Sequence, residues 1–126
     1  MGFDVISAPD APRAIGPYSQ ATRAGELIFC SGQAALDPAT MKLVEGGIRE
    51  QTRQTLRNLQ AVLQAAGSDL HRIVKVTVFL HDWADFGGMN EVFAEMFPAN
   101  PPARSTVRGE RYPPGSLIGI EAIALG

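Results

Sequence analysis

The chain has 126 residues, of which 45% are hydrophobic, and this length predicts one domain spanning residues 1–126. Its 11 Lys and Arg residues are scattered among 13 Asp and Glu residues, and the net charge of −2 argues against a nucleic-acid partner. One cysteine excludes an internal disulfide framework. No apolar run is long enough to span a bilayer and no export-signal pattern is present, so we expect a cytoplasmic protein with no membrane partner.

The first third of the chain predicts short strands separated by turns. Residues 3–7 read as an opening strand, and residues 8–17 as a proline-rich extended segment. Residues 24–26 (Ala-Gly-Glu) predict a hairpin turn that leads into a buried strand over residues 27–32. Residues 37–40 (Asp-Pro-Ala-Thr) have the composition of a turn.

An amphipathic helix is predicted from Ile48 onward. Apolar or small residues recur on one face at helical spacing: Ile48, Thr52, Thr55, Leu56, Leu59, Val62, Leu63 and Ala66. The opposite, solvated face carries Arg49, Glu50, Arg53, Gln54, Arg57 and Gln60. Gly67 supplies the C-terminal stop.

A strand and a second helix follow. Residues 73–80 are rich in β-branched side chains, which predicts a central strand. The helix has six residues at helical spacing: Phe86, Met89, Asn90, Phe93, Met96 and Phe97. A buried amide without partners costs about 1–3 kcal/mol, so Asn90 needs something to bind. Two interpretations stand: a structural hydrogen bond to a neighbouring loop, or presentation to a pocket or a subunit interface.

Two consecutive prolines introduce the next strand. Pro101 and Pro102 restrict the backbone, so the chain enters a strand at Arg104 with little freedom of direction. An arginine held in one orientation there can bind a carboxylate through two parallel hydrogen bonds from its planar guanidinium. The alternative interpretation is an ordinary salt-bridged arginine at a strand edge. Residues 117–125 predict the last strand, which we expect to pair with the strand at Arg104 through a turn at residues 112–115.

This order of elements predicts an α+β fold, with one mixed sheet and two helices packed on one face. Two strands have an apolar side, formed by Ile118, Ile120, Ala122 and Ala124 and by Val74, Val76 and Val78. No helix remains to cover the other face of the sheet. Association of copies of the chain through that face is therefore expected.

Metal chemistry has little support in the sequence. His71 and His81 are the only histidines, and Cys30 is remote from both. No Cys-x-x-Cys or His-x-x-x-His spacing occurs. We expect no metal site, two solvated histidines at strand ends, and a buried structural thiol at Cys30.

Seven features occur in order over nearly the whole chain: residues 16–21 (Gly-Pro-Tyr-Ser-Gln-Ala), 31–33 (Ser-Gly-Gln), 51–52 (Gln-Thr), 74–80, Asn90, 102–105 (Pro-Ala-Arg-Ser) and 120–124 (Ile-Glu-Ala-Ile-Ala). This ordered set resembles the Rid (YjgF-type) family of reactive-intermediate deaminases. The resemblance implies a chorismate-mutase-like fold and a homotrimer with clefts between subunits. It also implies that no cofactor is needed to hydrolyse enamines and imines such as 2-aminoacrylate to a 2-keto acid and ammonia.

The resemblance also implies roles for single residues. Arg104 matches the arginine that binds the substrate carboxylate. Gly32, beside Ser31, matches the position whose backbone faces the ligand, where glycine allows a close approach. Tyr18 matches an aromatic wall residue of the cleft.

Two further positions also match the family's cleft. Asn90 matches a helix residue that lines it, and Thr106 stands where many relatives place a cysteine. A hydroxyl and a thiol are similar in size, so binding through the backbone amide at this position can persist.

The sequence departs from the family at Gly119. Relatives with strong imine hydrolysis carry a glutamate there, which holds the attacking water. Glu121 points to the same side of its strand but lies about 6.6 Å further along, and whether it reaches the cleft is open. Loss of a carboxylate that acts as general acid or base lowers a rate by about 10²–10³-fold.

Alternative functions therefore stand beside deamination of small enamines. Gly119 makes room for a bulkier catabolic enamine of the aminomuconate type. A non-enzymatic trimer that senses a small carboxylate, such as a keto acid, is the other alternative. RNA cleavage, attributed to some relatives, is disfavoured by the acidic charge balance.

Overall fold

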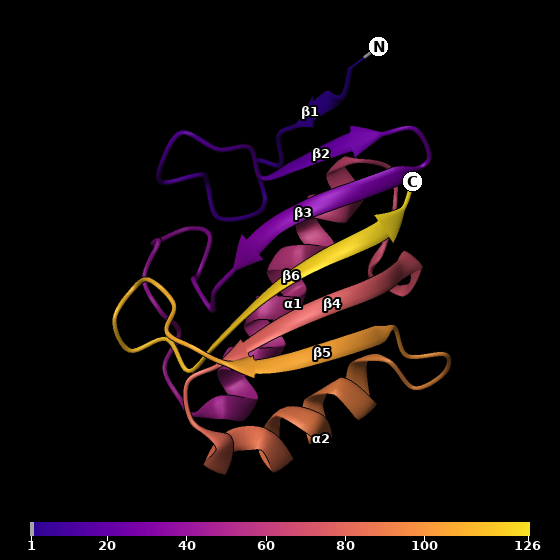
Figure 1. The fold of residues 1–126 in the computed structure, drawn as a ribbon. Coiled ribbons are helices and arrows are strands. Elements are labelled where there is room, and N and C mark those ends of the chain that lie inside the picture. Colours follow the sequence, from indigo (N-terminus) through magenta and orange to yellow (C-terminus); the bar gives the residue numbers. More distant parts are fainter. Residues whose placement is uncertain (1) are drawn as a thin grey trace.

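One six-stranded sheet runs through the molecule, and both helices lie on the same side of it (Figure 1). The computed structural model describes residues 2–126. In chain order, its elements are β1 (Asp4–Ile6), β2 (Ala21–Ala24), β3 (Leu27–Gln33), α1 (Ile48–Ala65), β4 (Ile73–Leu80), α2 (Phe86–Met96), β5 (Ala103–Arg108) and β6 (Ile118–Leu125), with short 3-10 turns at Leu70–Arg72 and Trp83–Asp85. The mixed α+β fold predicted from the sequence is confirmed.

The strand order is β1-β2-β3-β6-β4-β5, and it corrects one predicted pairing. β5 does not pair with β6; it runs parallel to β4, while β6 lies between β3 and β4 and is antiparallel to both. The physical reason is the crossover through α2, which returns the chain beside β4 in the same direction. Residues 109–117 then carry the chain to the other side of β4, where β6 completes the sheet.

α1 has the boundaries expected from its sequence. It begins after Gly47, whose N–H donates to Glu50 Oε1 at 2.7 Å, and Gly67 follows it with a φ of 79°. Seven of the eight predicted apolar or small positions are buried against the sheet: Ile48, Thr52, Thr55, Leu56, Leu59, Val62 and Leu63. The predicted solvated face is used in part to hold α2, because Arg49 pairs with Glu91 and Arg53 pairs with Glu95.

Two buried amides of α1 anchor loops rather than the core. Asn58 Nδ2 donates to the carbonyls of Ala34 and Leu36 at 3.0 and 2.8 Å, just after β3. Gln51 Oε1 accepts from the N–H of Leu117 at 2.8 Å, and its Nε2 donates to Gly115 O at 3.2 Å. The same helix therefore fixes the chain after β3 and the chain before β6.

The two faces of the sheet differ sharply. Residues that face the helices are buried, including Ile28, Cys30, Val76, Val78, Leu80, Ile118 and Ile120. Val74 was predicted to share that face but is 42% exposed, because the register shifts between Ile73 and Lys75 and Ile73 is buried instead. On the opposite face Phe29 is 41% and Val107 is 42% exposed, and no helix of residues 2–126 covers them.

Cys30 is buried in β3, as predicted, and burial raises the pKa of its thiol to about 12. The thiol therefore stays protonated at neutral pH and is a poor nucleophile. Within residues 2–126 no three His, Cys, Asp or Glu side chains gather as a metal site would require. No helix in that range has the length and apolar character needed to cross a membrane.

We expect Asn58→Ala to lower the free energy of unfolding by about 2–3 kcal/mol, because two buried carbonyls lose their donor. Urea unfolding followed by circular dichroism measures this change. Gln64→Ala, at an exposed position of the same helix, is the control and should change stability by no more than about 0.5 kcal/mol. Equal stabilities of the two variants would contradict the anchoring role of Asn58.

We expect Cys30 to react with an aromatic disulfide reagent at pH 8 at least about 100-fold more slowly in the native protein than in denaturant. In the folded chain the thiol is buried and its pKa of about 12 leaves almost no thiolate, whereas an unfolded thiol near its ordinary pKa ionises readily. Absorbance of the released thiol follows the reaction. Similar rates in the two states would show that β3 exposes Cys30.

Candidate functional site

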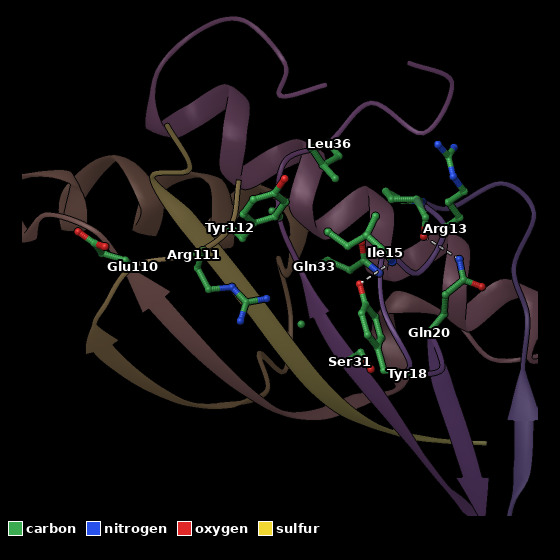
Figure 2. A pocket seen from close by; sticks show the side chains of 13 residues that line it. Arg13, Ile15, Tyr18, Gln20, Ser31, Gln33, Leu36, Glu110, Arg111 and Tyr112 are labelled. Atoms are coloured by element: carbon green, nitrogen blue, oxygen red, sulfur yellow. Dashed lines mark hydrogen bonds between the residues drawn. The ribbon is translucent and has the colours of Figure 1, made fainter. Parts of the chain in front are cut away.

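A cavity of about 500 Å³ opens where the segment before β2, the end of β3 and the loop after β5 meet (Figure 2). Its wall includes Tyr18, Ser31, Gly32, Gln33, Arg111 and Tyr112. The segment before β2 was predicted to be proline-rich and extended. Ala8 and Ala11 of this segment join the core, whereas Pro12, Ile15 and Tyr18 line the cavity.

Gln20 holds this segment in place. Its buried side chain accepts from the N–H of Ala8 at 2.6 Å and donates to the carbonyls of Ala8 and Pro12 at 3.0 and 2.8 Å. The hydroxyl of Ser31 donates to Ser19 O at 2.6 Å. These bonds replace the strand pairing that residues 8–19 lack, and they leave Tyr18 48% exposed at the cavity wall.

Arg111 occupies the space beside two glycines. A Cβ at Gly119 would lie 2.7 Å from its Cγ and Cδ, and a Cβ at Gly32 would lie 2.9 Å from its Cζ. Its guanidinium carbon also lies 5.4 Å from the centre of the Phe79 ring. The room that Gly119 was expected to leave for a bulky substrate is thus filled by a side chain of the protein.

The Nε atom of Arg111 is buried without a hydrogen-bond partner. In residues 2–126 the ion pairs are formed by other arginines, Arg49 and Arg53. Glu110 precedes Arg111 in the cavity wall, but its side chain points away from the guanidinium (Figure 2). The positive charge of Arg111 is therefore not compensated by a carboxylate of the described chain.

A second cavity, of about 620 Å³, lies between α2 and the start of β5. Arg104 and Asn90 line it together with Phe93, Phe97 and the prolines that precede β5. The guanidinium carbon of Arg104 lies 4.9 Å from the centre of the Phe93 ring and 5.7 Å from that of Phe86. This is a cation–π arrangement on the helix-covered side of the sheet.

Arg104 has no acidic partner among residues 2–126, so the salt-bridged alternative is not what the structure contains. Burial lowers the pKa of Arg104 from its ordinary value, but an arginine remains charged. Asn90 is half-buried and its side chain donates no hydrogen bond to a neighbouring loop in the described chain. Both side chains present polar groups to the cavity.

The predicted site residues therefore fall into separate groups within one chain. Tyr18, Ser31 and Gly32 line the first cavity, and Asn90 and Arg104 line the second. Thr106 and Glu121 line neither of these two cavities. Thr106 pairs with Val78 on the helix-covered side of the sheet, as Arg104 pairs with Val76.

Glu121 lies on the uncovered face of the sheet. It is exposed and stands opposite Thr77, while Gly119 stands opposite Phe79. Arg111 was not recognised from the sequence. It lies in a loop, far along the chain from Gly32, and no periodic pattern brings the two together.

Comparisons with known proteins show the family of the chain. The family model described as Endoribonuclease L-PSP matches residues 8–126. The chain is 47% identical to a mouse protein named 2-iminobutanoate/2-iminopropanoate deaminase, over 96% of this chain and 90% of that one.

Two solved structures are similar over almost the full chain. A Yersinia pestis protein of the Rid family has a TM-score of 0.93 and 42% identity, and the match covers 99% of this chain and 100% of that one. Escherichia coli TdcF, solved with bound serine, has a TM-score of 0.89 and 38% identity, with 98% of each chain covered.

Proposed function

The chain belongs to the endoribonuclease L-PSP family, which includes the Rid and YjgF proteins, and from this membership we propose that it hydrolyses small reactive enamines and imines to 2-keto acids and ammonia. A relative that is 47% identical carries the name of an imine deaminase, which supports the same type of reaction here.

The observation that carries the proposal is the unpaired guanidinium of Arg104. It is partly out of water, lies over two aromatic rings and faces a cavity of about 620 Å³. A desolvated cation without a counter-ion is stabilised most by an anion that accepts two hydrogen bonds. A carboxylate has the geometry to accept two parallel hydrogen bonds from a guanidinium. The relative TdcF was solved with bound serine, a small molecule that carries a carboxylate.

The reaction needs little beyond positioning. An enamine first takes a proton on carbon and becomes the imine. Water then adds across the C=N bond, its oxygen bonding to carbon and its proton passing to nitrogen. The hydroxyl proton then passes to the amino nitrogen, the C–N bond breaks as the C=O bond forms, and ammonia leaves. Imines already hydrolyse in water, so holding the carboxylate at Arg104 and the carbon beside a water supplies the required acceleration.

We also propose that the site is shared between copies of the chain in a homotrimer. The cavity at Gly32 and the cavity at Arg104 are separate in one protomer, and the uncovered sheet face exposes Phe29 and Val107. Packing of these faces would remove apolar surface from water. In such a trimer the Arg104 edge of one protomer meets the Gly32 cavity of the next, with the backbone of Gly32 and Thr106 facing the ligand.

A second candidate is a binding module for small carboxylates that performs no chemistry. It is favoured by one observation: Gly119 supplies no carboxylate, and Glu121 lies outside both cavities. Calorimetric titration with 2-keto acids, combined with the turnover assay below, separates the candidates. Binding without turnover of any enamine selects the module, whereas release of ammonia selects the deaminase.

We expect Arg104→Gln to lower kcat/KM for 2-aminoacrylate by about 10–10²-fold, because a charge-assisted pair contributes about 1.5–3 kcal/mol. The substrate is generated in situ by a pyridoxal-phosphate dehydratase, and keto-acid formation is followed against the uncatalysed rate. Arg57→Gln removes a positive charge from an exposed position of α1 and should retain the full rate. Equal rates for Arg104→Gln and the wild type would remove the assignment of Arg104.

We expect two inactive variants to complement each other if the cleft is shared. Gly32→Val places a side chain in the first cavity, where the guanidinium of Arg111 now lies, and blocks close approach to the Gly32 backbone, whereas Arg104→Gln disables the second cavity. Refolding the two chains together at equal amounts leaves about a quarter of the interfaces with both wild-type residues, so about a quarter of the activity should return. No recovery in mixed oligomers, identified by native mass spectrometry, would place the site within one chain.

A further inference from the structure

Arg111 is a charged group in the wall of the first cavity, and the proposed reaction does not use it. Its side chain lies across Gly119 and against Gly32, and its guanidinium lies over the ring of Phe79. A Cβ at either glycine would overlap the present position of this side chain. The two glycines therefore allow the guanidinium to enter the cavity wall.

The guanidinium of Arg111 has no negatively charged partner. Its Nε is buried without a hydrogen-bond partner, and no acidic side chain within residues 2–126 pairs with it. Two other charged residues of the cavity wall, Arg13 and Glu110, point their charged groups away from the Arg111 guanidinium (Figure 2). A cation that is partly desolvated and lacks a counter-ion favours an anionic guest, and the guanidinium fork favours a carboxylate.

We propose that Arg111 forms a second carboxylate-binding position, and that the preferred substrates are enamines or imines that carry two carboxylates. This inference rests on the proposed function and on the cleft proposed to be shared between protomers: Arg104 of one protomer binds the carboxylate next to the reacting carbon, and Arg111 of the next protomer binds the one at the far end of the substrate. The bond changes are those already described, so the products are a dicarboxylic 2-keto acid and ammonia.

The size of the cavity is compatible with such a guest. Its volume of about 500 Å³ lies within the usual range for small-molecule pockets, so a short dicarboxylate fits without displacing the protein. A monocarboxylate of similar size would leave the Arg111 charge unpaired. We therefore expect the protein to distinguish dicarboxylate from monocarboxylate substrates by the charge at the far end of the substrate rather than by its size.

The test compares two keto acids that differ at that end, 2-oxoglutarate and 2-oxobutyrate. We expect wild-type protein to bind 2-oxoglutarate at least about tenfold more tightly in calorimetric titrations. Arg111→Gln should abolish this preference and Arg111→Lys should restore part of it, while Arg57→Gln, an exposed charge-matched control, should keep it. Melting curves confirm that each variant is folded.

The same variants are then compared in turnover of the imines of glutamate and alanine, generated in situ by amino-acid oxidases. We expect the ratio of kcat/KM values, glutamate imine over alanine imine, to fall about tenfold in Arg111→Gln. Turnover of alanine imine together with equal binding of the two keto acids would overturn the inference and leave the proposed function standing. A third outcome is a preference for 2-oxoglutarate that depends on Arg111, with no turnover of either imine. This outcome would support the second carboxylate-binding position and contradict the proposed hydrolytic function.

Discussion

The proposed function depends on two guanidinium groups, those of Arg104 and Arg111. Both are partly withdrawn from water, and neither has a carboxylate beside it. A buried or half-buried charge normally pairs with an opposite one, and the cost of leaving it unpaired is large. Arg104 gains partial compensation from the rings of Phe86 and Phe93, and Arg111 from the ring of Phe79. Aromatic faces reduce that cost without occupying the hydrogen-bonding edge of the guanidinium, so both arginines remain able to accept an anion.

The fold supplies these positions through a small number of anchors. The crossover from β4 through α2 to β5 places Arg104 over the aromatic residues of α2. α1 holds both sides of the other cavity, because Asn58 binds the chain that leaves β3 and Gln51 binds the chain that enters β6. A helix packed in the core thus determines the geometry of loops that carry the polar groups.

Local features of the structure were accessible from the sequence, whereas long-range ones were not. Periodicity located α1, α2 and β4, and Gly25 marked the turn between β2 and β3 because it needs a positive φ. The pairing of β5 was predicted wrongly, since neither strand sequence records that α2 makes the connection a parallel crossover. The position of Val74 was predicted wrongly because a register shift interrupts the alternation of the strand.

Among the site residues, Arg104 was identified from the two prolines that precede it and from family resemblance. The position of Arg111 beside Gly32 depends on three-dimensional packing alone.

The loop that carries Arg111 is attached to the scaffold on both sides of that residue. The N–H of Gly109 donates to Leu80 O at 2.9 Å before it, and Gln51 binds Gly115 and Leu117 after it. Residues 110–112 contribute little to the buried core, so their exchange during evolution costs little stability. Selection for a new metabolite can then act on this short segment while the helices and sheet stay unchanged. A change of specificity in such a lineage would leave overall sequence identity high and reside in very few positions.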